Sequence, residues 1–183
     1  MHQFVSRGGY KLDHAMDAFE LSAAGLICAD LGCSTGGFTD CLLQRGAAKV
    51  YAIDTAYGVL DWKLRKDGRV VVMERTNAMH ATLPEPAALI AIDVAWTRQC
   101  HILPAARRML APDGTVVSLV KPHYEADPAQ LRHGVLPREL LPDVFRRVEQ
   151  SIEEAGCMLL AVAESPNPHP GGNLELLAWL RPT

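Results

Sequence analysis

Short apolar runs alternate with longer amphipathic stretches along the whole chain. Seven runs are predicted strands, over residues 26–31, 49–54, 69–73, 89–94, 115–121, 158–164 and 174–180. The stretches between them predict helices over 37–45, 58–66, 98–110 and 138–155, with an opening helix over 12–21. Strands that alternate with crossover helices form a parallel sheet covered on both faces. The sequence therefore predicts an α/β doubly wound fold, and 183 residues predict one domain over residues 1–183.

Composition limits the chain to the globular class. Hydrophobic residues make up 49% of the sequence and charged residues 21%, which suffices for a packed core. No run approaches the roughly 18 apolar residues of a membrane-spanning helix, and the first residues lack the apolar stretch of a secretory signal. We therefore expect a cytoplasmic protein with no membrane segment. Five cysteines without a Cys-x-x-Cys pair argue against a disulfide framework or a zinc ribbon, so no metal is expected.

The distribution of charge bears on nucleic-acid binding. A net charge of -3 and an isoelectric point near 6.1 argue against an indiscriminate nucleic-acid binder. One segment still gathers five cations, Lys63, Arg65, Lys66, Arg69 and Arg75, with Asp61, Asp67 and Glu74 beside them. Two interpretations remain open for this cluster: a solvated surface around a turn, or a patch that holds phosphates.

The segment Asp30-Leu-Gly-Cys-Ser-Thr-Gly-Gly-Phe-Thr39 follows the first predicted strand and opens a helix. Its three glycines allow a tight turn and a close approach of the backbone to a ligand at a helix N-terminus. A dinucleotide fingerprint needs glycine where Ser34 stands, and a P-loop needs lysine where Phe38 stands. The segment thus predicts a ligand loop of another kind, the alternative being an ordinary glycine-rich turn.

Asp54 ends the second predicted strand. In a doubly wound sheet, a carboxylate at that position reaches the ribose hydroxyls of a nucleoside ligand. With pyrophosphate-bearing ligands disfavoured, the pattern points to a nucleoside without a pyrophosphate, and S-adenosylmethionine is the common one. Asn77 follows the third predicted strand, where it either reads an adenine amine or forms a turn.

Polar residues and long loops gather where the active edge of this sheet is expected. Lys11 stands just before the opening helix, Asp93 and Lys121 end the fourth and fifth strands, and Glu175 lies within the seventh. Each of them alone is as readily explained by a stabilising ion pair as by catalysis. The predicted loops 122–137 and 165–172 both follow a strand, so they are candidate walls of a substrate site, or else plain connectors.

At these positions the sequence resembles the FtsJ-like family of RNA 2′-O-ribose methyltransferases, most closely its hemolysin-A (TlyA) branch. The matching segments are Ser6-Arg-Gly-Gly-Tyr-Lys-Leu12, residues 30–40, Leu42-Leu-Gln-Arg-Gly-Ala47, Glu74-Arg-Thr-Asn77, Asp93-Val94, Leu119-Val-Lys-Pro122 with Glu125, and Gly172-Asn-Leu-Glu175. They stand in the order of the family and cover nearly the whole chain.

The resemblance implies a seven-stranded, Rossmann-like methyltransferase sheet whose last strand is antiparallel. It implies S-adenosylmethionine as cofactor and RNA, by family default ribosomal RNA, as substrate. It places a catalytic tetrad on Lys11, Asp93, Lys121 and Glu175. The cofactor-binding residues it implies, with Asn77 and Asp93 added, are Asp30, Gly32, Cys33, Ser34, Thr35, Gly36, Gly37, Phe38 and Asp54.

The chain departs from the branch in three places. The branch normally carries an amino-terminal S4-type RNA-binding domain, for which the residues before Ser6 leave no room. Ala95-Trp-Thr97 replaces the usual Ser-Phe-Ile-Ser, and His123-Tyr124 replaces Gln-Phe. If RNA is the substrate, recognition would depend on a folded RNA, on a partner protein or on a second copy of the chain. Arg7 and Lys11 would add to the basic cluster. Trp96 or Tyr124 would stack on an unpaired base, the alternative for either ring being packing in the core.

Two other functions remain open from the sequence. One is a methyltransferase of the same fold that acts on the hydroxyl of a small molecule, and the other is a non-catalytic protein that binds the cofactor or RNA. The role of Lys121 is also open, because it acts either as a neutral base or as a cation that stabilises the developing alkoxide.

Overall fold

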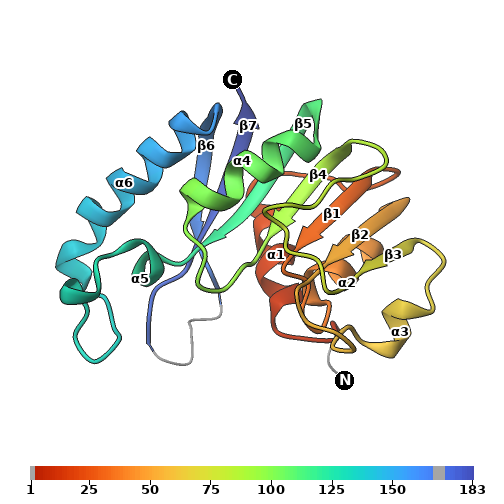
Figure 1. Ribbon diagram of the computed structural model, residues 1–183, viewed down its shortest axis with the longest axis horizontal. Helices are drawn as coiled ribbons and strands as arrows, with labels where there is room; N and C mark the ends of the chain where they lie inside the picture. The colour runs from red at the N-terminus through yellow and green to blue at the C-terminus, as the bar shows by residue number, and fades with distance from the viewer. Residues whose placement is uncertain (1–2, 167–171) are drawn as a thin grey trace.

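Seven strands form a single sheet in the computed structural model, which describes residues 3–166 and 172–183 (Figure 1). Their order across the sheet is β3-β2-β1-β4-β5-β7-β6. The bounds are β1 Ile27–Leu31, β2 Lys49–Ile53, β3 Val70–Met73, β4 Ala87–Ile92, β5 Leu110–Val120, β6 Cys157–Glu164 and β7 Leu176–Pro182. The predicted strands are confirmed, with shifts of a few residues at their ends.

The sheet is parallel except around its last strand. β1 pairs in parallel with β2 and β4, and the pairs β2 with β3 and β4 with β5 are also parallel. β7 lies antiparallel between β5 and β6. The order of the strands reverses between β1 and β4, and in such sheets ligands bind at that reversal, outside the carboxyl ends of the strands. The predicted fold class is therefore confirmed, including the antiparallel last strand.

Helices cover both faces of the sheet (Figure 1). The described helices are α1 Gly8–Ala18, α2 Gly37–Gln44, α3 Trp62–Arg65, α4 Gln99–Met109, α5 Pro122–Glu125 and α6 Leu141–Glu154, with 3₁₀ turns at Pro128–Gln130 and Arg138–Leu140. On one face, Leu12 of α1 and Leu42 of α2 join a fully buried apolar core. On the other face, Ile102 of α4 and Val148 of α6 join a second one. Burial of these apolar faces holds the helices against the sheet.

The first helix starts earlier than predicted. It begins at Gly8 rather than at residue 12, so Lys11 lies inside the helix and not before it. Glycine has a low helix propensity, which hid this start in the sequence. Gly9 makes room for Phe4, because a Cβ on Gly9 would come within 2.3 Å of the Phe4 ring. On α2, Gly37 allows the close approach to α1, because a Cβ there would come within 2.7 Å of the Gly9 amide nitrogen.

Three further boundaries differ from the predictions. The helix predicted over 58–66 is only the single turn α3, which Asp61 caps by accepting from the Lys63 amide at 2.8 Å. Residues 122–137 are not all loop, since α5 begins with Pro122 in its first turn. Glu175 precedes β7 rather than lying within it. The predicted loop 165–172 lies largely outside the described residues.

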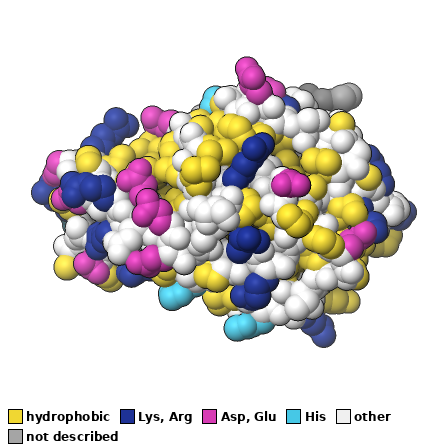
Figure 2. Space-filling view, turned by 90° about the horizontal axis from the view of Figure 1, so that it is seen from above, with side chains coloured by type: hydrophobic (Ala, Val, Ile, Leu, Met, Phe, Trp, Pro, Cys, Tyr) yellow, Lys and Arg dark blue, Asp and Glu magenta, His cyan; other side chains and the backbone are white. Residues whose placement is uncertain are grey.

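Acidic and basic side chains are interspersed on the face that Figure 2 shows, which is the one seen from above. The arrowheads of β1, β4 and β5 in Figure 1 point away from that face. None of the helices in residues 3–166 and 172–183 is long and apolar enough to cross a membrane. In the same residues, no group of three or more His, Cys, Asp or Glu side chains is placed to hold a metal ion. Cys100 is exposed, and the other four cysteines are buried and unpaired.

Candidate active site

The glycine loop connects β1 to α2 at the carboxyl edge of the sheet. Gly32 follows β1 with a φ of +89°, a conformation that other residues rarely adopt. A Cβ at this position would come within 2.5 Å of the Asp93 carbonyl oxygen. Gly36 adopts a φ of +100° and is the N-cap of α2. Glycine is therefore required at the turn of the loop and at its close contact with the end of β4. The tight turn that the sequence predicted for this loop is present.

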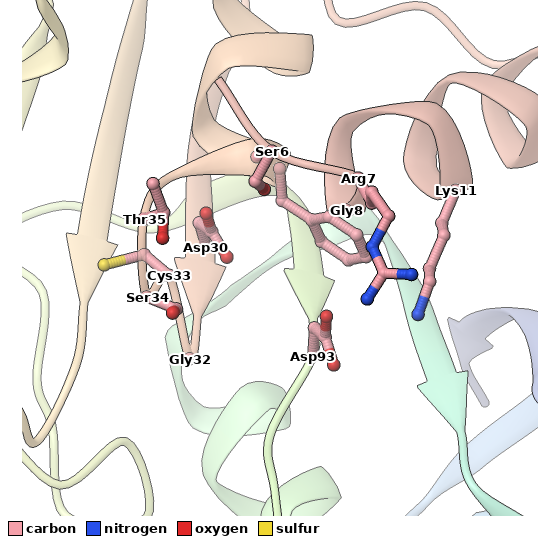
Figure 3. Close-up of a pocket in the computed structure, with 12 residues that line it drawn as sticks. Ser6, Arg7, Gly8, Lys11, Asp30, Gly32, Cys33, Ser34, Thr35 and Asp93 are labelled. Atoms are coloured by element: carbon pink, nitrogen blue, oxygen red, sulfur yellow. The ribbon is translucent and has the colours of Figure 1, made fainter. Parts of the chain in front are cut away.

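Two cavities adjoin this loop and share Gly32, Ser34 and Asp93 in their walls. The first, of about 240 Å³, lies between the loop and the start of α1 and is lined also by Arg7 and Lys11. Figure 3 shows these two side chains extending from α1 beside Asp93. The second, of about 390 Å³, is lined also by the residues that follow β2 and β3, Asp54, Thr55, Thr76 and Asn77 among them. The two cavities lie where the strand order reverses.

Asp54 binds the loop through backbone amides. Its Oδ2 accepts from the Ser34 amide at 2.7 Å, and its Oδ1 accepts from the Ala56 amide at 2.8 Å. The carboxylate is half-buried in the wall of the larger cavity. A carboxylate has about four lone-pair positions, so both oxygens retain the capacity to accept from a ligand hydroxyl.

Asp30 is fully buried in the wall of the smaller cavity. Its Oδ2 accepts from the Thr39 amide at 2.9 Å and from Thr39 Oγ1 at 2.7 Å, which ties the end of β1 to α2. Its Oδ1 has no partner within the part of the chain that the structure describes. Burial raises the pKa of this carboxyl to about 7, although the two bonds from Thr39 act in the opposite direction. A buried acceptor without a donor is thus available beside the cavity.

Four chain segments bring the predicted tetrad to one edge as two ion pairs. Lys121 Nζ lies 2.6 Å from Asp93 Oδ1 and donates also to the Val94 carbonyl oxygen at 3.2 Å. Lys11 Nζ lies 2.5 Å from Glu175 Oε2. The Glu175 side chain is 1% exposed, and those of Lys121 and Lys11 are 12% and 14% exposed. The pairs are largely withdrawn from water, where the effective interaction between charges is stronger than at the surface.

Asn77 forms the turn that the sequence allowed for it. Its Oδ1 accepts from the Met79 amide at 2.9 Å, as in an Asx turn. Its side chain also lines the larger cavity together with Asp54. The turn is therefore established, and contact with an adenine remains a prediction.

Trp96 lies exposed beside the tetrad, so its interpretation as a core residue is wrong. It is 84% exposed and stacks on Tyr124, with ring centroids 4.9 Å apart and ring planes 28° from parallel. Its φ of +57° is unusual for a residue other than glycine. Tyr124 in turn packs against His123, so Trp96, Tyr124 and His123 form one aromatic group.

Glu125 was not identified from the sequence as the residue that fixes the segment of the aromatic group against α4. The side chain is buried, and its Oε1 accepts from the Gln99 amide at 2.8 Å at the start of α4. Burial raises the pKa of the Glu125 carboxyl. The two partners are far apart in the sequence, and the resemblance at Glu125 was the one signal that marked it.

The predicted basic cluster extends from the connection between β2 and β3 to Arg75 just after β3, and three of its five cations pair with carboxylates. Arg65 pairs with Glu74, Arg69 pairs with Asp67 at 2.7 Å, and Lys63 lies 3.3 Å from Asp40. The remaining two, Lys66 and Arg75, lie over aromatic rings. The cluster therefore combines a paired part with a part that is free to meet an anion.

Comparison with known proteins gives a consistent family. Residues 4–181 match the FtsJ-like methyltransferase family. The chain is 42% identical over 184 residues to the 16S/23S rRNA (cytidine-2′-O)-methyltransferase TlyA of Mycobacterium tuberculosis, covering 97% of this chain and 68% of that protein. It is 36% identical over 182 residues to hemolysin A of Brachyspira hyodysenteriae, covering 96% and 76%. A solved structure of the hemolysin type from Streptococcus thermophilus superposes with a TM-score of 0.96 at 38% identity, covering 100% of this chain and 68% of that one.

Proposed function

The chain belongs to the FtsJ-like methyltransferase family, and from that premise we propose that it methylates a 2′-hydroxyl in ribosomal RNA, with S-adenosylmethionine as methyl donor. The observation that carries this function is the Lys121–Asp93 pair, held beside the glycine loop at the point where the strand order reverses. The similarity to rRNA (cytidine-2′-O)-methyltransferases supports ribose as the acceptor.

The two cavities fit S-adenosylmethionine by their donor and acceptor chemistry. The cofactor offers an ammonium group and two ribose hydroxyls as donors. Asp54 has spare acceptor positions for the hydroxyls, and the buried Asp30 Oδ1 receives no hydrogen bond from residues 3–166 or 172–183. The close approach at Gly32 leaves the loop backbone open to a ligand. The residues 32–38 and Asn77 would complete the wall. When bound, the cofactor supplies a methyl group on a positively charged sulfur.

Lys121 handles the charge of the acceptor hydroxyl. Its Nζ uses two positions on Asp93 Oδ1 and the Val94 carbonyl, so a third position faces the acceptor. It meets the hydroxyl either with an N–H that stabilises the alkoxide or with a lone pair that takes the proton. The Lys11–Glu175 pair fixes α1 against the segment before β7, which keeps the wall of the smaller cavity in place.

The acceptor nucleotide lies against the aromatic group beside the tetrad. Trp96 presents an exposed ring near the end of β4, and Arg7 extends from α1 into the same edge (Figure 3). Bases of unpaired RNA stack on such rings, and a guanidinium binds phosphate. The reaction is cytoplasmic in this proposal, and a partner protein or a second copy would assist recognition of the folded RNA.

Methyl transfer to purified ribosomal RNA tests this function. Labelled S-adenosylmethionine is incubated with RNA from a strain that lacks the gene, and the product is mapped at nucleotide resolution. We expect the label at a 2′-O position and none with the Lys121→Ala variant. Label that enters only small-molecule hydroxyls would overturn RNA as the acceptor, whereas tight cofactor binding without transfer to any acceptor would indicate a non-catalytic protein.

A further inference from the structure

Two aromatic side chains stand on the outer surface of the connection between β2 and β3. Tyr57 is 69% exposed and Trp62 is 66% exposed, and Val59 and Val71 nearby are 40% and 38% exposed. Large side chains of this kind are mostly buried in soluble proteins, and adjacent exposed ones indicate a binding surface. Burial in the core does not explain either ring.

A cation lies over each of these rings. The Arg75 guanidinium carbon is 4.3 Å from the centroid of the Tyr57 ring, and Lys66 Nζ is 4.8 Å from the centroid of the Trp62 ring. Among the described residues, neither cation has a salt bridge. Each aromatic–cation pair therefore presents an apolar ring and an uncompensated positive charge together.

Two carboxylates of this region lie beneath its surface, and a third, Asp67, is 27% exposed and pairs with Arg69. The Glu74 side chain, which pairs with Arg65, is 6% exposed, and that of Asp40, which lies near Lys63, is 2% exposed. The Lys63 side chain by contrast is 65% exposed. A ligand that approaches from solvent thus meets mainly cations, although the whole chain carries a net charge of -3.

This surface is continuous with the predicted cofactor site. The Asp61 amide donates to the Thr35 carbonyl at 3.0 Å, which joins the start of α3 to the glycine loop. The Thr76 amide, next to Arg75, donates to the Asp54 carbonyl at 2.9 Å. Figure 1 shows α3 beside β3, at the outer end of the sheet. A strand bound at this surface would extend from the active edge.

We propose that Tyr57, Trp62, Lys66 and Arg75 form a stacking face for unpaired nucleotides that flank the acceptor in the RNA. The rings stack on bases of any sequence, and the cations bind the phosphates between the bases. A protein partner would call for a wider aliphatic surface than these two valines provide. The inference rests on the proposed function, because it assumes that RNA reaches the active edge.

Binding of a labelled single-stranded RNA of mixed sequence, compared with its duplex, tests the face. We expect Tyr57→Ala with Trp62→Ala to lose at least tenfold in affinity for the single strand and little for the duplex, since stacking needs unpaired bases. The same variant should raise KM for ribosomal RNA with an unchanged Kd for S-adenosylmethionine. Replacing both residues by Phe should restore most of the affinity. The matched control is Met158→Ala with Leu160→Ala, another exposed apolar pair, on β6.

Several results would contradict the proposed stacking face. Unchanged affinity for the single strand would contradict RNA binding at this surface and would indicate a protein partner for the two rings. An equal loss of cofactor affinity would show that the segment merely supports the glycine loop. If the double variant fails to fold, Lys66→Glu with Arg75→Glu provides the same test, with a loss of at least tenfold expected. RNA binding is measured directly, without methyl transfer. Unchanged binding by the variant would therefore contradict the stacking face, whereas a wild-type protein that transfers no methyl group to RNA would contradict the proposed function.

Discussion

Lys121 reaches back across the edge of the sheet to Asp93 on the neighbouring strand end. The register aligns Ile92 of β4 with Ser118 of β5, so Lys121 stands two positions further along than Asp93. The lysine Nζ nevertheless lies 2.6 Å from Asp93 Oδ1. The side chain is thereby held over the end of β4, where the two cavities share Asp93 as a wall.

Loss of the Lys121 amine should separate binding from chemistry. We expect Lys121→Ala to reduce methyl transfer at least about a hundredfold, the lower range for a positioned proton-handling group, while the fold and the Kd for cofactor stay unchanged. Lys121→Arg should fail as well, because a planar guanidinium does not fit a site built for one nitrogen. Single-turnover rates check both variants. The control is Lys49→Ala, which removes a different lysine–carboxylate pair, the one with Glu85. Near-normal rates with either Lys121 variant would refute the assignment.

Asp54 should contribute to cofactor affinity. We expect Asp54→Ala to weaken the binding of S-adenosylmethionine and of its demethylated product by about 1–3 kcal/mol, since hydrogen bonds to a charged group are lost. Calorimetry measures the change, with Asp67→Ala as a control, because Asp67 pairs with Arg69 on the surface outside both cavities. Tight binding of a nicotinamide dinucleotide in place of S-adenosylmethionine would contradict the nucleoside site.

The Lys11–Glu175 pair should matter for stability in addition to catalysis. Glu175→Ala leaves the Lys11 ammonium largely buried without its partner, and breaking a buried pair costs about 3–5 kcal/mol. Urea unfolding should show that loss. Lys11→Met with Glu175→Leu removes both charges, and we expect it to recover most of the stability. Activity that recovers together with stability would show that the pair is structural only.

Asp30 should make stability depend on pH. Its pKa is raised by burial to about 7 in the folded protein, compared with about 3.9 in an unfolded chain. Between these two pKa values the folded state binds more protons than the unfolded state. The contribution of Asp30 to the free energy of unfolding is therefore complete below about pH 4 and falls as the pH rises toward 7, by at most about 1.4 kcal/mol per pH unit. Asp30→Asn keeps an acceptor for Thr39 and should flatten this fall. Urea unfolding at pH 5 and pH 7 compares the two proteins, and equal slopes would show that Asp30 does not titrate in this range.

The sheet and two members of the predicted tetrad, Asp93 and Lys121, were accessible from periodicity at strand ends, whereas Lys11 and Glu175 were marked chiefly by the family resemblance. Buried parallel strands are short apolar runs, and the polar residue that ends such a run lies at the ligand-binding edge. That rule placed Asp93 and Lys121 correctly. It left open which lysine meets which carboxylate, because the Lys11–Glu175 contact joins residues at opposite ends of the chain.

Other features depend on packing that the sequence does not display. Gly8 and Gly9 disfavour a helix locally, yet a Cβ on Gly9 would come within 2.3 Å of the Phe4 ring, so the packing of Phe4 requires glycine there. The five cations from Lys63 to Arg75 form one cluster in the sequence, whereas in the fold the buried side chains of Glu74 and Asp40 pair with two of them. Trp96 follows an apolar strand and is the type of residue expected in a core, and only the turn after β4 brings it outside.

Trp96 should contribute to RNA binding rather than to the stability of the fold. A non-glycine residue held at a positive φ costs on the order of 1–3 kcal/mol, and a ring that is 84% exposed contributes little burial to offset that cost. We therefore expect Trp96→Gly to leave the protein at least as stable in thermal unfolding. The same variant should raise KM for RNA at least about tenfold, since stacking on one base contributes about 1–3 kcal/mol. Trp96→Phe keeps a ring and should retain most of the affinity. Leu160→Ala, an exposed apolar residue on β6, controls for a nonspecific loss of apolar surface. A destabilised Trp96→Gly protein with normal KM would show instead that the ring holds Tyr124 and the wall of the site in place.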